Sequence, residues 1–259
     1  MSLSNLVTRV KSRYQRSVGG WLYRRPFAMP AERPYVSFTF DDFPISALHT
    51  GGEILRAAGT RGTYYAAFGL MDSDAPTSRI FGLRDLAPLR EHGHELACHT
   101  FAHCDSWDTG AAAFDASLED NLRALRQHAP ELRFRSFSYP ISSPHPLVKR
   151  AAARRFESCR GGGQTFNSGI ADLALLKSYF IEKSAHRPEA IKSVIDANAA
   201  ARGWLIFSTH DVRPEPTQYG CTPELFRRVL DWSLASGATV LPVAEVLDAL
   251  GADKRLAAA

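Results

Sequence analysis

The chain has 259 residues, of which 45% are hydrophobic and 22% are charged. These are ordinary values for a folded globular protein, and they argue against disordered or collagen-like chains. No run of 18 apolar residues occurs, so no transmembrane helix is expected. The formal net charge of +4 by itself would suit a nucleic-acid or membrane-surface partner.

The positive charge is concentrated at the start of the chain. Residues 1–30 contain six basic residues and no acidic residue: Arg9, Lys11, Arg13, Arg16, Arg24 and Arg25. Without these six, 25 basic residues face 27 acidic ones, which gives the rest of the chain a net charge of −2. We therefore expect no nucleic-acid partner, because a nucleic-acid-binding domain carries its positive charge on its own surface.

Residues 1–34 are expected to form a basic N-terminal arm and linker. Apolar residues repeat there at helical spacing, with basic residues between them: Leu3, Leu6, Val7, Val10 and Tyr14. The pair Gly19-Gly20 is predicted to end this helix. Such a helix suits either docking on anionic lipid or packing against its own domain or a second subunit.

From residue 35 onward, strand-like and helix-like segments alternate. The predicted strands are 35–40, 62–70, 94–100, 134–139, 157–161, 173–181, 204–209 and 238–243. The predicted helices are 47–59, 84–93, 114–129, 146–156, 188–202, 222–236 and a last one that ends near residue 250. This order predicts parallel strands in a distorted (β/α)7-8 barrel over residues 35–252, with a tail at 253–259; a doubly wound open sheet is the alternative.

Several of the predicted strands end in polar side chains. In such a barrel, functional sites form where the strands end, in the loops that lead into the helices. The residues found there are Asp41, Asp42, His99, His103, Tyr139 and His210. Two acids and three histidines are thus expected at one rim, although they are far apart in the sequence.

The spacing of His99 and His103 can place both rings on one side of a helical turn. Two imidazoles and one carboxylate form a ligand set that leaves positions free for water and substrate, and Zn²⁺ or another divalent ion suits it. The second aspartate can then accept a proton from water whose pKa the metal lowers to about 7. Without the histidines, Asp41-Asp42 would more simply be a turn or a helix cap.

A set of four motifs resembles the polysaccharide deacetylases, that is, the nodulation-type chitooligosaccharide deacetylases and their relatives in carbohydrate esterase family 4. The motifs are Thr39-Phe40-Asp41-Asp42, His99-Thr-x-x-His103, Phe137-Ser-Tyr-Pro140 and Phe207-Ser-Thr-His210-Asp211. The resemblance spans about residues 35–245. It implies a distorted (β/α) barrel, a divalent metal that is often zinc, and hydrolysis of an N-acetyl or O-acetyl group on a sugar.

The resemblance also implies a role for each matched position. Asp41 is expected to be the catalytic base and His210 the general acid. Asp42, His99 and His103 are expected to bind the metal. The backbone N–H of Ile141 is expected to stabilise the oxyanion. The side chains expected to contact substrate are Phe43, Tyr139, Arg160 and Phe207.

Three positions depart from the family pattern. Phe43 stands where the family usually has glycine, and it is expected to narrow the entrance. Ser138 stands where an arginine often braces the catalytic base, and Arg160 is the candidate to replace it from the fifth strand. The acid that tunes the catalytic histidine is not recognisable, and Asp172 and Glu182 are both candidates.

The sequence therefore predicts a metal-dependent carbohydrate deacetylase with an N-acylated carbohydrate as substrate. Two alternatives stay open: another carbon–nitrogen hydrolase on the same scaffold, such as a deformylase or an allantoinase-like amidase, and a non-catalytic carbohydrate-binding module. No apolar leader precedes the arm, which predicts a cytoplasmic location. Membrane or subunit contact through the arm would be compatible with that location.

Overall fold

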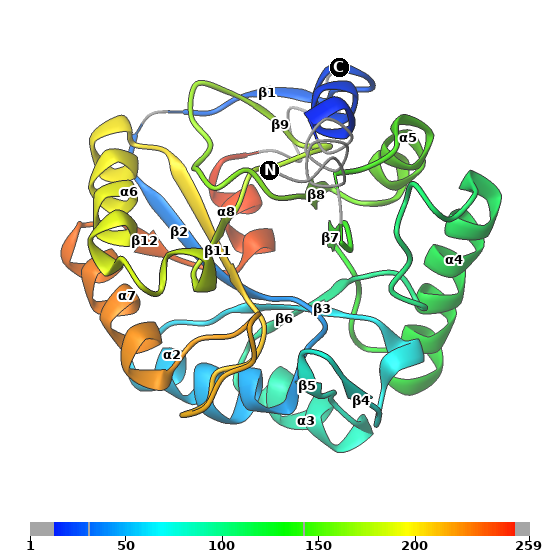
Figure 1. The fold of residues 1–259 in the computed structure, drawn as a ribbon, viewed down its shortest axis with the longest axis horizontal. Helices are drawn as coiled ribbons and strands as arrows, with labels where there is room; N and C mark the ends of the chain where they lie inside the picture. Colours follow the sequence, from blue (N-terminus) through cyan, green and yellow to red (C-terminus); the bar gives the residue numbers. More distant parts are fainter. Residues whose placement is uncertain (1–12, 31, 142, 252–259) are drawn as a thin grey trace, which may run out of the picture.

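The computed structural model describes residues 13–30, 32–141 and 143–251. A curled sheet lies inside a ring of helices (Figure 1). Its strands follow the order β10-β11-β2-β3-β6-β7-β8, with β12 paired to β2, and all of these pairs are parallel. The strands are β2 (Tyr35–Phe40), β3 (Thr63–Ala66), β6 (Glu95–Cys98), β7 (Ser136–Ser138), β8 (Ser158–Arg160), β10 (Tyr179–Phe180), β11 (Trp204–Thr209) and β12 (Thr239–Val240). The predicted distorted (β/α) barrel is confirmed.

The helices that connect these strands begin and end within three residues of the predicted positions, except that the first begins six residues after its predicted start at residue 47. They are α2 (Glu53–Ala57), α3 (Leu83–Glu91), α4 (Ala111–His128), α5 (Pro146–Arg155), α6 (Pro188–Ala201), α7 (Pro223–Ala235) and α8 (Val243–Ala249). A π-helical stretch, Ala47–Gly52, precedes α2. Thr222 caps α7 as predicted, because its side chain accepts a hydrogen bond from the backbone N–H of Leu225. None of the helices in the described part of the chain is long and apolar enough to cross a membrane.

The central strands bring distant residues together. β2 is buried along its whole length and pairs with β11 over six residues, so that Phe40 lies beside Thr209. The residues that follow these two strands, Asp41 and His210, therefore emerge side by side at one end of the barrel. Along β2, Phe38 packs against Phe207 and Phe226 under the surrounding helices.

The barrel is incomplete between β8 and β10, and the predicted strand 173–181 is confirmed only over the two residues of β10. The short β9 (Ile170–Asp172) and a loop precede β10. The loop instead hydrogen-bonds to β8 through Cys159, which contacts the backbone of Leu173 and Leu176 at 2.8 Å. Both leucines are buried, so the apolar pattern of this segment reflects burial of a loop rather than of a regular strand.

The described part of the N-terminal arm packs on the barrel. Residues 13–21 are helical, so the helix ends one residue after the predicted end at Gly19-Gly20. The predicted helical turns between residues 1 and 12 lie outside the described residues. Gly19 also permits close packing, because a Cβ there would lie 2.8 Å from the carbonyl oxygen of Pro144. Lys149 of α5 donates a hydrogen bond to the carbonyl of Gly19 at 2.8 Å.

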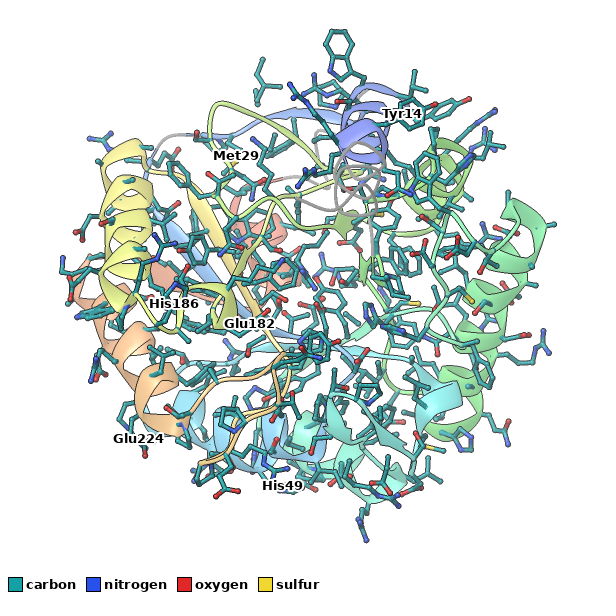
Figure 2. All side chains as sticks on the ribbon, viewed as in Figure 1. Tyr14, Met29, His49, Glu182, His186 and Glu224 are labelled. Atoms are coloured by element: carbon teal, nitrogen blue, oxygen red, sulfur yellow. The ribbon has the colours of Figure 1, made fainter. Side chains whose placement is uncertain are left out.

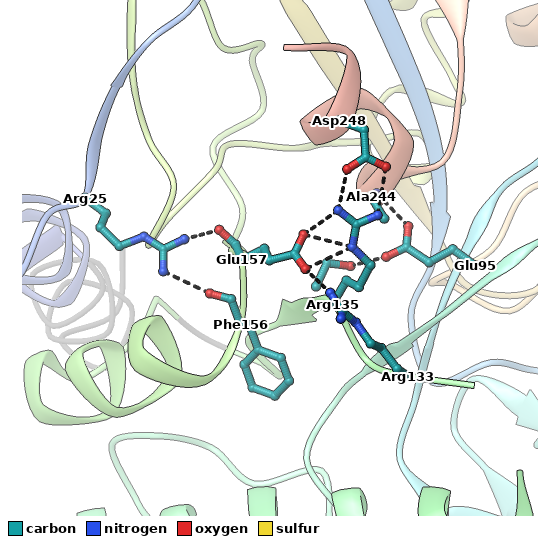
Figure 3. Close-up of polar contacts among 9 residues, drawn as sticks. Arg25, Glu95, Arg133, Arg135, Phe156, Glu157, Ala244 and Asp248 are labelled. Atoms are coloured by element: carbon teal, nitrogen blue, oxygen red, sulfur yellow. Dashed lines mark hydrogen bonds and ion pairs between the residues drawn. The ribbon is translucent and has the colours of Figure 1, made fainter. Parts of the chain in front are cut away.

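A strand and an arginine also attach the arm to the barrel. β1 (Pro26–Ala28) pairs antiparallel with β9. The Arg25 guanidinium donates to the backbone carbonyls of Phe156 and Glu157, and the Glu157 carboxylate pairs with Arg135, which in turn pairs with Asp248 of α8 (Figure 3). The arm is thereby linked to β8 and to the last helix of the barrel.

Candidate active site and metal centre

The loops after β2, β6, β7 and β11 carry the candidate residues to one end of the barrel. Their backbone turns sharply, with positive φ at Asp42 (62°), Thr100 (60°), His103 (51°) and Ile141 (64°). Positive φ is unfavourable for residues other than glycine, and such strain is concentrated at functional sites in proteins. These turns let the chain present side chains into the space above the sheet.

Three of the predicted residues converge on one point. Asp42, His99 and His103 offer ligand atoms that all lie within 4.8 Å of one another. Oδ1 of Asp42 lies 3.5 Å from Nε2 of His99 and 3.1 Å from Nε2 of His103. This buried oxygen accepts no regular hydrogen bond, whereas Oδ2 accepts one from Thr77 at 2.8 Å. A buried carboxylate oxygen facing two imidazole nitrogens is a donor set that fits a divalent cation such as Zn²⁺.

Hydrogen bonding orients His99 for this role. Its Nδ1 lies 2.8 Å from the carbonyl oxygen of Ser138, which can only accept, so Nδ1 carries the proton and Nε2 offers its lone pair. Burial lowers the pKa of His99 to about 4, which keeps the ring neutral near pH 7. Burial alone would also lower the pKa of His103, but the Asp42 carboxylate outweighs it and raises that pKa. The same carboxylate would attract a metal cation.

Asp41 is held next to this cluster as a buried carboxylate. Its Oδ1 accepts a hydrogen bond from Arg160, and its Oδ2 accepts one from Ser208 at 3.0 Å. Burial alone would raise the pKa of Asp41, but Arg160 and the neighbouring histidines, of which His99 is one, lower it to about 2. Asp41 is therefore ionised at neutral pH and can accept a proton.

Arg160 reaches Asp41 from β8 and is itself fully buried. It also donates to Ser138 at 2.6 Å and to Ser178 at 3.1 Å, and it lies over the ring of Tyr65 at 4.9 Å from the centroid. The sequence did not single out Ser178, Ser208 or Tyr65 as parts of this support. Strand parity, which turns Tyr65 on β3 and Ser208 on β11 toward the barrel interior, could have indicated those two, whereas Ser178 lies just before β10.

Replacing Arg160 tests this ion pair. We expect Arg160→Met to lower the free energy of unfolding by about 3 kcal/mol or more, because it leaves the Asp41 charge buried without its partner. In the double variant Asp41→Asn/Arg160→Met both charges are gone, so the loss should be smaller than the sum of the single losses by at least about 1 kcal/mol. Urea unfolding of the four proteins measures this coupling, and additive losses would contradict it.

His210 lines the same cavity as the three metal-ligand candidates. Its Nδ1 is 3.1 Å from the carbonyl oxygen of Tyr219, so Nδ1 is the donor in that contact. Nε2 is then the nitrogen that can take up and release a proton. Asp172 and Glu182, the two candidate acids, do not supply this contact: Asp172 lies 2.6 Å from Lys149, and Glu182 lies on the cleft wall. Burial raises the pKa of Glu182 to about 8.

The candidate residues share one cavity of about 1010 Å³. Its walls include Asp41, Asp42, His99, His103, Arg160 and His210. Tyr139 and Ile141 also line it, and the Tyr139 hydroxyl donates to the carbonyl of Ala174 at 3.0 Å. A cavity of this size lies at the upper end of those that bind small molecules, which span about 300–1,000 Å³.

A comparison with protein families matches residues 28–156 to the polysaccharide deacetylases. The chain belongs to the polysaccharide deacetylase family. No curated protein matches it significantly. The matched region includes the candidate base and all three candidate metal ligands, whereas Arg160 and His210 lie beyond it.

Solved structures of the same family share the fold. The chitin deacetylase of the fungal pathogen Colletotrichum lindemuthianum is 16% identical, with a TM-score of 0.61 over 85% of this chain and 89% of that one. The family 4 carbohydrate esterase of Streptomyces lividans, solved with acetate, is 17% identical, with a TM-score of 0.55 over 80% and 91%. A family 4 pseudoenzyme from Bacillus anthracis is 13% identical, with a TM-score of 0.58 over 84% and 66%. At these identities the likeness concerns the fold alone.

Two side chains that the family pattern placed in the substrate site are elsewhere. Phe43 and Phe207 are fully buried, and neither is among the described residues that line the cavity. The turn at Asp42 and Phe43 directs the Phe43 ring down onto Phe81, with the centroids 4.6 Å apart. Phe207 faces the helices on β11, whereas the next residue, Ser208, faces the barrel interior. These two predictions are wrong.

Ile141 offers a test of a role that depends on backbone rather than side chain. Its side chain is 70% exposed, and its positive φ is unfavourable for a β-branched residue. We expect Ile141→Gly to retain most hydrolytic activity and to relieve backbone strain of about 1 kcal/mol. Steady-state rates and thermal unfolding measure both effects, and a large loss of activity would point to a role for the side chain itself.

Proposed function

We propose that this chain is a metal-dependent hydrolase that removes an N-acetyl group, or alternatively an O-acetyl group, from a sugar or oligosaccharide. The observation that supports this most is the shared cleft of Asp41, the Asp42-His99-His103 donor set and His210. These residues come from three separate loops, and hydrogen bonds with Arg160, Ser208, the Ser138 carbonyl and the Tyr219 carbonyl orient Asp41, His99 and His210. Zinc is the ion we expect in the donor set.

The chemistry follows from the positions of these residues. A divalent ion bound by Asp42, His99 and His103 would act as a Lewis acid that polarises the acyl carbonyl and lowers the pKa of water. Asp41, held by Arg160 and Ser208, accepts the proton of the attacking water. The Ile141 N–H donates a hydrogen bond to the oxyanion that forms on the acyl group.

His210 completes the reaction. The tetrahedral intermediate of an amide collapses only when its leaving nitrogen is protonated, and His210 can deliver that proton from Nε2. The contact of Nδ1 with the Tyr219 carbonyl keeps the ring oriented during this transfer. Because the fold also occurs in a pseudoenzyme, the presence of both Asp41 and His210 is what favours catalysis over carbohydrate binding alone.

Acyl release from a panel of substrates tests the proposal. Acetate and formate are measured after incubation with N-acetylated, O-acetylated and N-formylated sugars, with and without a chelator. We expect acetate release that the chelator stops and that added Zn²⁺ restores. Formate release alone would favour the deformylase alternative. No release from any substrate by metal-loaded protein would contradict the proposed function.

A further inference from the structure

The segment 13–24 exposes large apolar side chains next to the cleft. Tyr14, which Figure 2 shows at the edge of the molecule, is 60% exposed. The exposed fractions of Trp21, Leu22 and Tyr23 are 85%, 48% and 44%. Soluble proteins rarely expose several large apolar side chains within one short segment, and tryptophan and tyrosine are enriched where proteins meet the membrane–water interface. We call the exposed side chains of residues 13–24 the arm face.

The arm face is also strongly basic. Arg13, Arg16 and Arg24 are exposed among its apolar residues, and no acidic residue occurs between positions 1 and 30. The rest of the chain has a net charge of −2. An anionic surface would therefore attract the arm face and repel the body, which gives the protein one preferred orientation on such a surface.

Neighbouring segments extend the apolar surface. Ile170 on β9 is 67% exposed, and Leu147 at the start of α5 is 48% exposed. β9 pairs with β1, and α5 hydrogen-bonds to the helix through Lys149 and Gly19. Exposed apolar residues thus also occur on the two barrel segments that contact the arm.

The arm face is held in a fixed relation to the cleft. The contacts of Arg25 with the carbonyls of Phe156 and Glu157 secure its end, and Figure 1 shows the helix of residues 13–21 beside α5 and β9. The cleft wall itself includes Gln15, Arg16, Gly20 and Arg24. A surface that the arm face touches therefore lies at the mouth of the cleft.

We propose that the arm face docks the protein on a membrane surface that contains anionic lipid, with the cleft opening toward that surface. The combination of exposed aromatic rings with arginines fits a lipid interface, where rings enter the headgroup region and guanidinium groups contact phosphates. A second copy of the chain fits less well, because two arm faces would bring their arginines together. The proposal concerns binding and does not depend on which acyl group the enzyme removes.

Sedimentation of the full chain with lipid vesicles tests the docking. We expect binding to vesicles that contain phosphatidylglycerol, weaker binding as salt is added, and little binding to pure phosphatidylcholine. The variant Trp21→Ala/Leu22→Ala should lower the vesicle partition coefficient at least about tenfold, because it removes the two neighbouring apolar anchors. The control Leu83→Ala/Leu234→Ala removes exposed leucines outside the arm face and should bind like the original chain.

Charge reversal provides a second, independent test of the docking. Arg13→Glu should weaken binding to anionic vesicles, whereas Arg123→Glu, the same change on the exposed side of α4, should weaken it much less. Neither Trp21 nor Leu22 lines the cleft, so hydrolysis of a soluble substrate should be unchanged in the double variant. That readout separates failed docking from a failed enzyme or fold.

Two outcomes would overturn the proposal. One is the absence of binding to anionic vesicles, or equal binding by the chain and by Trp21→Ala/Leu22→Ala. The other is a dimer in size-exclusion chromatography that the same double variant dissociates, because the arm face would then be a subunit interface.

Discussion

Asp41→Asn is expected to abolish hydrolysis while the protein still binds its metal. The amide has almost the shape of the carboxylate but cannot accept the proton of the attacking water. Loss of a general base typically costs about 10²–10⁴-fold in rate. The donor atoms of the metal site belong to Asp42, His99 and His103, so the metal content should stay near that of the original protein.

The variant must be distinguished from one that merely unfolds, because Asn leaves the buried Arg160 without its charged partner. Arg160 keeps its hydrogen bonds to Ser138 and Ser178, which limits that damage. Metal content and circular dichroism report on folding in the same samples. The control is Asp85→Asn, the same change at a buried carboxylate on α3 outside the cleft. Substantial hydrolysis by Asp41→Asn would mean that another group is the base.

The order of the helices and strands could be predicted because the apolar residues follow a helical spacing in some segments and form short strand-like runs in others. β2 and β11 are mainly apolar, with only serine and threonine among the apolar residues, and both are buried along their whole length, as expected for strands covered on both faces; the structure gives both with the predicted bounds. The helix α7 was marked by Thr222 and Pro223 at its start, and the observed cap has that geometry. Elements with strong local sequence patterns of this kind therefore keep their predicted bounds in the folded protein.

Most of the candidate site could be predicted for a related reason. In parallel strands the carboxyl ends share one edge, so polar residues directly after the strands converge whatever their separation in sequence. Asp42, His99 and His103 meet in this way. The support of Asp41 by Arg160 could be proposed only as a replacement for a missing arginine. The hydrogen bond from Ser208 to Asp41 could not be predicted, because no motif in the sequence links these two residues.

The incorrect predictions share a physical cause. An apolar residue is expected to be buried, but its type does not reveal the direction in which its side chain points. Phe207 is apolar and lies near the site in sequence, yet strand parity turns it toward the helices. Phe43 follows a residue with positive φ, which redirects its side chain, and no pattern in the sequence predicts that turn. Each outcome depends on a partner that is distant in sequence.

His103→Ala is expected to lose the metal while the fold persists. The His103 side chain is 27% exposed, whereas that of His99 is 2% exposed and packed at the end of β6. Truncating His103 therefore removes a ligand without opening a cavity in the core. Because changes to groups that only support a ligand already cost about 10–100-fold in metal affinity, the loss of a ligand itself should exceed about 100-fold.

Two measurements check this prediction without relying on activity. Metal analysis after dialysis should fall from about one divalent ion per chain to near zero, the stoichiometry that one donor set implies. Added Zn²⁺ should raise the melting temperature of the original protein, because a ligand present at 100 times its Kd stabilises by about 2.7 kcal/mol, and it should leave His103→Ala unchanged. His186→Ala, an exposed histidine outside the cleft, is the matched control and should keep both properties. Full metal content in His103→Ala would mean that the ion is bound by a different set of residues.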